Sequence, residues 1–270
     1  MEKSIEKTVK YIRKKSRIVP KIGIILGSGF GKFSNKLDLD AMFDYKDIPG
    51  FVSVNVEGHA GRFMLGKIGG RPIALMNGRL HYYEGHSMRE ITYPIRAMKS
   101  LGIEYLIVIA AVGGLKNKYK AGNIALIKDH INFMGDNPLR GSHEEQYGER
   151  FPDMSSCYDQ NLRKKALEIA QRNNIKISEA VYFGVRGPSY ETPSEIKCFE
   201  MLGGDVIGMS VIPEAIVANQ MGIKILGISY ITNLAAGLSK EPLSHKEVLK
   251  TAKDGEQNMA KILLEMIKQI

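Results

Sequence analysis

The sequence predicts an α/β fold: a single domain over residues 1–270, built on a mixed, mostly parallel central sheet flanked by helices. Short apolar runs at residues 106–112 and 225–231 have the length of buried strands, and segments of helical periodicity alternate with such strands. The pair Gly69-Gly70 joins two further apolar segments as a hairpin would, which adds an antiparallel element. No repeat, low-complexity tract or Pro/Ser-rich linker divides the chain.

The first half of the chain is expected to place one helix before the sheet. Ile5, Val9 and Ile12 fall at helical spacing, which predicts an amphipathic helix with a basic outer face. Ser87 and Glu90 have the spacing of a capping box, so the next helix should begin there. The other expected elements are a strand at 21–26, a β-ribbon at 63–67 and 72–76, a helix at 87–101, and strands at 105–111 and 124–127.

The second half continues the alternation of strands and helices. Thr192 followed by Pro193 predicts a helix start, and Ser244 with Glu247 has the spacing of a capping box that opens one C-terminal helix. The polar segment 135–153 is the longest expected loop, and loops of that length are often functional. The remaining elements are helices at 159–174 and 214–221 and strands at 180–183, 206–208 and 224–231.

Composition and charge distribution argue against several classes of protein. The net charge is +9, but residues 1–21 hold eight Lys or Arg against two Glu, and no nucleic-acid-binding motif accompanies them. The apolar runs are too short to cross a bilayer, and the N-terminus lacks the apolar core of a signal peptide. Cys157 and Cys198 predict neither a disulfide framework nor a metal site. We therefore expect a cytoplasmic protein that binds neither nucleic acid nor membrane.

The segment from Asn77 to His86 concentrates polar side chains on a strand-to-helix loop. Arg79 offers a bidentate fork for an oxyanion, and His81 adds a donor on the same side of an extended chain. The end of a strand is where α/β enzymes keep their sites. The residues alone leave two interpretations open, a phosphate grip and a solvated polar loop.

Other anion-binding candidates are weaker. The glycine-rich segment 27–31 follows a strand and precedes an expected helix, and Ser28 could offer its hydroxyl and backbone N–H to an anion. Lys32 stands where a dinucleotide fingerprint has its third glycine, which disfavours a dinucleotide-dependent oxidoreductase. A lone histidine such as His59 usually has a structural role. The Ala111 segment could be either an anion contact or an ordinary glycine turn.

Three segments suit a planar heterocycle and a sugar. Tyr190 and Glu191 combine a stacking ring with a hydrogen-bond acceptor, although a carboxylate beside a helix start also stabilises the helix dipole. Asn233 follows a strongly apolar strand and can donate or accept toward a base nitrogen. His245 follows the Ser244 cap, where a neutral imidazole could meet a sugar hydroxyl or simply lie on the surface.

Taken in order from residue 22 to about residue 248, these segments resemble the trimeric purine nucleoside phosphorylases that act on inosine and guanosine. The resemblance rests on Gly27-Ser-Gly29, Gly58-His-Ala-Gly61, Gly78-Arg-Leu-His-Tyr-Tyr-Glu-Gly85, Asn137-Pro-Leu-Arg-Gly141, Arg150-Phe-Pro152, Gly187-Pro-Ser-Tyr-Glu-Thr192, Gly208-Met-Ser210, Thr232-Asn233 and His245.

The resemblance implies a nucleoside phosphorylase fold with a partly barrel-like sheet. It implies a glycosyltransferase of purine salvage, which reversibly converts 6-oxopurine (deoxy)ribonucleosides and inorganic phosphate into free base and α-(deoxy)ribose 1-phosphate. Neither a metal nor an organic cofactor is expected, and the assembly is expected to be a homotrimer.

The resemblance also assigns roles to individual residues. It implies phosphate contacts from Ser28, His59, Arg79, His81, Ala111 and Ser210, ribose contacts from Tyr83, Met209, His245 and a neighbouring subunit's Phe151, and purine contacts from Tyr190, Glu191 and Asn233. His81, Glu191 and Asn233 are the expected catalytic residues.

One departure and two further alternatives remain. The family usually carries Thr-Asn-Ala-Ala-Gly-Gly where this chain has residues 109–114, Ile-Ala-Ala-Val-Gly-Gly, which affects the expected substrate preference and rate. A methylthioadenosine phosphorylase of the same fold would favour an acidic residue in place of Asn233 and an apolar one in place of His245. A non-enzymatic nucleoside-binding protein would bind inosine without releasing hypoxanthine.

Overall fold

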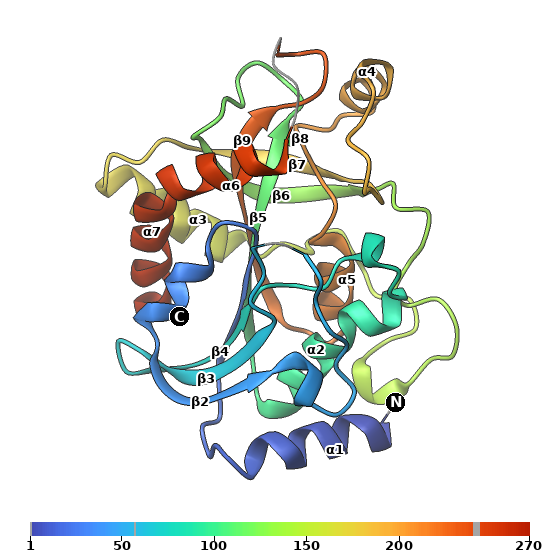
Figure 1. The fold of residues 1–270 in the computed structure, drawn as a ribbon, viewed down its shortest axis with the longest axis vertical. Coiled ribbons are helices and arrows are strands. Elements are labelled where there is room, and N and C mark those ends of the chain that lie inside the picture. The colour runs from blue at the N-terminus through green and yellow to red at the C-terminus, as the bar shows by residue number, and fades with distance from the viewer. Residues whose placement is uncertain (1, 57, 240–243) are drawn as a thin grey trace.

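The structure, a computed structural model, describes residues 2–56, 58–239 and 244–270 (Figure 1). Within these residues one sheet has the strand order β2-β3-β4-β1-β5-β8-β7-β6-β9. The strands are β1 (Ile22–Leu26), β2 (Asp38–Asp44), β3 (Arg62–Ile68), β4 (Arg71–Asn77), β5 (Tyr105–Gly114), β6 (Ile124–Asn132), β7 (Ile177–Gly184), β8 (Val206–Gly208) and β9 (Lys224–Leu234).

The helices follow the expected alternation with these strands. The α-helices are α1 (Glu2–Arg13), α2 (Met88–Leu101), α3 (Gln160–Arg172), α4 (Pro193–Met201), α5 (Ile212–Gln220), α6 (His245–Asp254) and α7 (Glu256–Gln269). Short 3-10 helices are η1 (Gly31–Lys36), η2 (Tyr45–Asp47), η3 (Tyr82–Glu84) and η4 (Glu145–Tyr147). The expected capping box at Ser87 is present, and the helix expected to start at Thr192 does so with a capping box to Glu195. At the expected capping box of Ser244, the Ser244 side chain accepts the Glu247 N–H.

The sheet is mixed and partly closed. Strands β4, β1, β5 and β9 run parallel, each paired with the next, and β3 and β2 extend them in antiparallel fashion beyond β4. On the other side β5 pairs with β8, β8 with β7, β7 with β6, and β6 with β9, which itself pairs with β5. These strands therefore close into a ring, which confirms the expected partly barrel-like sheet.

Alternate residues of β5 face two hydrophobic layers, as the two-residue period of a strand requires. Leu106 and Val108 pack in the layer that contains α2 and α5, whereas Ile107 and Ile109 pack in the layer that contains α3 and α7. Figure 1 shows α3 and α7 together on one side of the molecule, away from α2 and α5. Burial on both faces explains why β5 reads as a continuous apolar run.

Three expectations differ from the structure. Strand β2 was not expected, because it is an edge strand in which only Ala41 and Phe43 are buried and exposed aspartates interrupt the apolar pattern. The C-terminal helix divides at Gly255, where a side chain would collide with the Tyr230 ring. Segment 27–31 leads into the 3-10 helix η1 rather than an α-helix, so no long helix dipole points at it.

Strand β5 also continues through Gly113 and Gly114, where a turn was one expectation. Gly114 pairs with Val206, and a side chain on Gly114 would collide with the Tyr119 carbonyl. The two glycines thus allow close strand contact at the rim of the ring instead of reversing the chain.

Candidate active site

A cavity of about 120 Å³ opens at the carboxyl ends of the parallel strands. Ser28 follows β1, Arg79 follows β4, and Asn233 lies near the end of β9. The lining residues are Gly27, Ser28, Arg79, His81, Tyr83, Ala110, Ala111, Val112, Gly113, Tyr190, Glu191, Ile207, Gly208, Met209, Ser210, Thr232, Asn233, Ala235, His245 and Val248.

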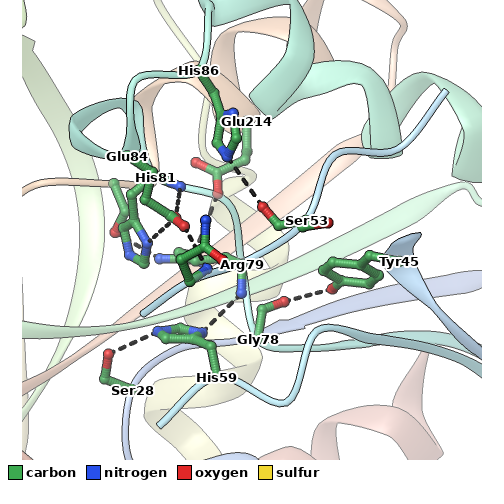
Figure 2. A network of polar contacts seen from close by, with 12 residues as sticks. Ser28, Tyr45, Ser53, His59, Gly78, Arg79, His81, Glu84, His86 and Glu214 are labelled. Carbon is green, nitrogen blue, oxygen red and sulfur yellow. Dashed lines mark hydrogen bonds and ion pairs between the residues drawn. The ribbon is translucent and has the colours of Figure 1, made fainter. Parts of the chain in front are cut away.

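The loop after β4 is shaped by Gly78 and by a hydrogen bond from Tyr45. Gly78 has a φ of 100°, and an added Cβ would lie 2.9 Å from the Cβ of His59, so a side chain is excluded. The Tyr45 hydroxyl donates to the Gly78 carbonyl over 2.6 Å (Figure 2). This anchoring places Arg79 and His81 in the cavity wall.

Arg79 is a buried guanidinium with unused donors. Its side chain is 1% exposed, and its Nη1 donates to the Ser210 hydroxyl over 2.7 Å. Its Nε lies 3.4 Å from a carboxylate oxygen of Glu214 without the alignment of a hydrogen bond. Among the described residues, Nε and Nη2 have no hydrogen-bond partner. Because buried donors without partners are costly, an oxyanion in the cavity would stabilise this arrangement.

His81 lies beside Arg79 as a neutral imidazole. Burial lowers the pKa of His81 despite the opposing effect of its hydrogen bond to the Glu84 carboxylate. A carboxylate oxygen of Glu84 lies 3.3 Å from His81 Nδ1 and accepts the His81 backbone N–H over 2.8 Å. This carboxylate favours the proton on Nδ1 and leaves Nε2 as an acceptor. The ring stacks on Tyr83 with a centroid distance of 4.7 Å.

His59 stands behind Ser28 and does not line the cavity. Its Nδ1 accepts the Arg79 backbone N–H over 2.9 Å, and its Nε2 lies 2.9 Å from the Ser28 hydroxyl (Figure 2). In a neutral ring that accepts at Nδ1, the proton is on Nε2 and is donated to Ser28. The Ser28 hydrogen then remains free for the cavity. His59 therefore orients Ser28 from behind the cavity wall, and its expected contact with phosphate stays a prediction.

The protonation of His59 should control acid stability. Burial, followed by repulsion from His81 and Arg79, lowers the pKa of His59 from 6.5 to about 3. Between these values only the unfolded state binds the proton, so stability should fall as pH drops below 6.5, by at most about 1.4 kcal/mol per pH unit. Urea unfolding on both sides of pH 6.5 should show that His59→Asn loses less free energy of unfolding in acid than the parent protein does.

His143→Asn provides the control, because His143 lies in the 135–153 loop and does not line this cavity. If His59→Asn lost as much free energy of unfolding in acid as the parent protein, the assignment of a neutral, buried His59 would be contradicted.

Asn233 is turned toward the cavity by a β-bulge. In the β5–β9 pairing, Val112 lies opposite Ile231 and Gly113 opposite Asn233, so Thr232 is an extra residue. The Thr232 hydroxyl donates to Asn233 Oδ1 over 2.8 Å, and Asn233 Nδ2 donates to the backbone carbonyl of the next residue over 3.0 Å. These bonds fix the amide and leave one Nδ2 hydrogen without a partner among the residues that the structure describes.

Tyr190 and Glu191 form the same end of the cavity. Both line it, and burial raises the pKa of the Glu191 carboxyl above its ordinary value. Tyr190 remains 40% exposed, so its ring is accessible to a flat ligand. Both residues precede α4, which begins at the Thr192 cap. The arrangement offers an acceptor, a ring and the Asn233 amide to one heterocycle.

Ser210 is positioned by a strained turn. Val211 has φ 66° and ψ −54°, and the Ile212 N–H donates back to the Ser210 carbonyl over 2.7 Å. A β-branched residue in this conformation costs roughly 1–3 kcal/mol. The Ser210 N–H donates to the Tyr182 hydroxyl over 3.1 Å, which completes the support. The strained residue thus directly follows Ser210, whose hydroxyl contacts the Arg79 guanidinium.

The structure brings most of the expected site residues into this one cavity. Those that line it are Ser28, Arg79, His81, Tyr83, Ala111, Tyr190, Glu191, Met209, Ser210, Asn233 and His245. His59 lies behind the wall, and Phe151 lies outside it with 85% exposure. Sequence reasoning did not assign Glu214 or Thr232, although each stands within four residues of an expected site residue.

The departure at residues 109–112 makes one wall apolar. Ala110 and Val112 line the cavity, whereas Ile109 packs in the core. Ala110 lies opposite Ser229 in the β5–β9 register, and the buried Ser229 hydroxyl has no hydrogen-bond partner among the described residues. A polar side chain at 110 would lie beside that hydroxyl, so the substitution removes a possible partner for it.

The fold and the cavity together are those of an α/β protein that offers one site to an oxyanion and a heterocyclic compound. Comparison with known proteins agrees: residues 21–268 match the phosphorylase superfamily. Purine nucleoside phosphorylase 1 of Bacillus subtilis (strain 168) is 46% identical over 269 residues, which cover 100% of this chain and 99% of the relative.

Solved structures show the same relationship. Isoform 2 of purine nucleoside phosphorylase from Schistosoma mansoni, in complex with cytosine and ribose-1-phosphate, has a TM-score of 0.95 and 40% identity, covering 99% of this chain and 96% of that chain. The S. mansoni enzyme with inosine and with adenosine has TM-scores of 0.94 and 0.93, at 36% and 37% identity, covering 99% of this chain and 96% and 97% of those chains. The present chain belongs to the purine nucleoside phosphorylase family within the phosphorylase superfamily.

Proposed function

We propose that this chain catalyses the reversible phosphorolysis of 6-oxopurine (deoxy)ribonucleosides such as inosine and guanosine, in purine salvage. One observation carries the proposal: the cavity holds a buried guanidinium with unused donors together with a carboxylate and a fixed amide. An oxyanion at the guanidinium and a purine at the carboxylate and amide would have the ribose between them. The C1′–N9 bond breaks, its electron pair passes to the purine, and a phosphate oxygen bonds to C1′.

At the phosphate end, Arg79 supplies the positive charge. Ser28, Ser210 and the Ala111 backbone add donors, while His59 orients Ser28. Neutral His81 can accept the hydrogen of a monohydrogen phosphate at Nε2. Preorganised donors of this kind contribute on the order of 3 kcal/mol each to the transition state. Positioning and electrostatics account for this chemistry, and we propose inorganic phosphate as co-substrate without a metal or organic cofactor.

At the purine end, Glu191 accepts N1–H and Asn233 donates toward N7. Cleavage leaves negative charge on the purine, and the Asn233 donor stabilises it. Adenine has no proton at N1, so the Glu191 carboxylate disfavours it. A related S. mansoni enzyme has been crystallised with adenosine, so the discrimination should be sought in turnover rather than in binding alone.

At the ribose, Tyr83, His245 and the Met209 backbone line the centre of the cavity. In this single chain the Phe151 side chain is 85% exposed. Such exposure is expected of a side chain that covers the ribose of a neighbouring subunit. We propose a homotrimer on this basis.

No helix among the described residues has the length and apolarity to span a bilayer. We propose the cytoplasm as the location of this protein.

Phosphate-dependent release of hypoxanthine from inosine tests the function. We expect release with phosphate, ribose 1-phosphate as the second product, and little turnover of adenosine. Equal release without phosphate would identify a hydrolase instead. Binding of inosine with no release would identify a nucleoside-binding protein, and preference for methylthioadenosine would identify the related phosphorylase.

A further inference from the structure

We propose that Thr232 is a positioning residue for the purine: its hydroxyl holds the Asn233 amide so that an N–H donor is kept for the leaving base. The inference rests on the proposed function and deepens it, because it concerns how the departing purine is stabilised. Thr232 is 4% exposed, and it lines the candidate active site together with Asn233.

The β-bulge in β9 gives Thr232 its place. Ile231 and Asn233 each lie opposite a residue of β5, whereas Thr232 between them has no partner in that register. In a regular strand neighbouring side chains point to opposite faces, but here Thr232 and Asn233 both line the cavity. The bulge therefore brings a hydroxyl and an amide together on one side of the strand.

The hydrogen-bond partners of the Asn233 amide decide its orientation. The Leu234 backbone carbonyl can only accept, so the amide atom 3.0 Å from it is the donor Nδ2. Oδ1 is then the atom that lies 2.8 Å from the Thr232 hydroxyl. A flipped amide would bring Oδ1 against the Leu234 carbonyl, oxygen to oxygen. Asn233 therefore keeps an Nδ2 hydrogen for a purine, while Thr232 occupies Oδ1.

The Thr232 hydroxyl must act as the donor in this arrangement. Its oxygen lies 3.2 Å from the Val112 carbonyl and 2.8 Å from Asn233 Oδ1, and both of these atoms are acceptors. The shorter contact has the better hydrogen-bond distance, so the single hydroxyl hydrogen is directed to the amide. Gly113 leaves room for the amide, because an added Cβ there would lie 3.3 Å from Asn233 Nδ2.

A held donor matters most while the purine leaves. As the C1′–N9 bond breaks, its electron pair passes to the purine, and a fixed Nδ2–H stabilises the negative charge that reaches N7. Without the Thr232 hydroxyl, Oδ1 loses its donor, and the Leu234 carbonyl alone among the described partners restrains the amide. The nucleoside would still bind. We therefore expect the loss in kcat rather than in KM.

Turnover of inosine and of 7-methylinosine at saturating phosphate tests the proposal. The 7-methyl nucleoside carries a positive charge on its imidazole ring, so its base leaves as a neutral molecule and needs no donor at N7. Thr232→Val should lower kcat about tenfold or more for inosine, but less than about threefold for 7-methylinosine. Thr232→Ser keeps the hydroxyl and should stay within about threefold of the parent protein for both. Equal losses for the two nucleosides in Thr232→Val, or a Thr232→Ser variant as slow as Thr232→Val, would overturn the proposal.

A double-mutant cycle shows whether Thr232 acts through Asn233. In an Asn233→Ala background, Thr232→Val should reduce inosine turnover by less than about twofold further, because no amide is left to position. Fully additive losses would contradict the proposal. Thr8→Val is the matched control: Thr8 is 0% exposed, its hydroxyl donates to the Ser4 carbonyl over 3.1 Å, and it does not line the cavity. It should leave kcat for both nucleosides unchanged.

Nuclear magnetic resonance of the Asn233 side-chain amide separates this inference from the proposed function. Its signals are those that Asn233→Ala lacks. They should report an amide that is rigid on the ps–ns timescale in the parent protein and in Thr232→Ser, and mobile in Thr232→Val, whether or not inosine is turned over. A rigid amide in Thr232→Val would refute the positioning role. An inactive parent protein that shows the expected pattern would refute only the proposed function.

Discussion

Replacing Arg79 by alanine should reduce kcat/KM for phosphate about 1,000-fold, because two or more charge-assisted donors are lost from a water-poor site. Arg79→Lys keeps the positive charge but loses the planar set of donors. Because Nε and Nη2 of Arg79 are both unused by the protein, we expect that a single charge does not suffice and that the loss in Arg79→Lys is not far smaller. Initial rates at varied phosphate and saturating inosine would measure the effect.

Arg79→Ala also leaves the Glu214 carboxylate buried without its ion-pair partner, so the variant should unfold more easily. Circular dichroism and the unfolding temperature must therefore accompany the kinetics. Arg79→Ala combined with Glu214→Gln removes the stranded charge and should recover stability but not activity. Near-normal phosphate kinetics in a folded Arg79→Ala variant would show that the guanidinium does not hold the nucleophile.

Asn233→Asp should raise adenosine turnover about 10- to 100-fold and lower inosine turnover by a similar factor. An aspartate accepts the 6-amino group of adenine, whereas it faces the 6-oxo group of hypoxanthine as a second acceptor, and an unsatisfied polar group costs roughly 1–3 kcal/mol. Competition between the two nucleosides, followed by separation of the bases, would measure the change.

The pH dependence of Asn233→Asp should identify its partner. Burial raises the pKa of Glu191, and only protonated Glu191 can donate to the bare N1 of adenine. Adenosine turnover should therefore increase as pH falls through the raised pKa of Glu191, while inosine turnover decreases. Asn35→Asp, on the exposed surface, is the matched control. Unchanged adenosine turnover in Asn233→Asp would contradict the purine assignment.

The expected helices and strands were confirmed where local signals agree with tertiary contacts. Ser87 and Thr192 open helices as expected, and the apolar runs of β5 and β9 form two paired, buried strands of the sheet. Prediction was wrong where tertiary contacts decide the outcome. Gly255 ends α6 because Tyr230 lies against it, a contact that no local pattern reveals.

Local patterns along the chain predict the alternation of elements and contain the ordered residues that identify the family. Apolar periodicity, caps and glycines act over a few residues, so they can be read along the chain. The contacts among Arg79, His59 and Glu214, in contrast, arise only when the chain is folded. Their burial, the unused donors of Arg79 and the tautomer of His59 depend on neighbours brought together from β1, β4 and α5 by the closing sheet. Such distances and desolvation are properties of the assembled fold, and they turn a polar loop into the wall of the cavity.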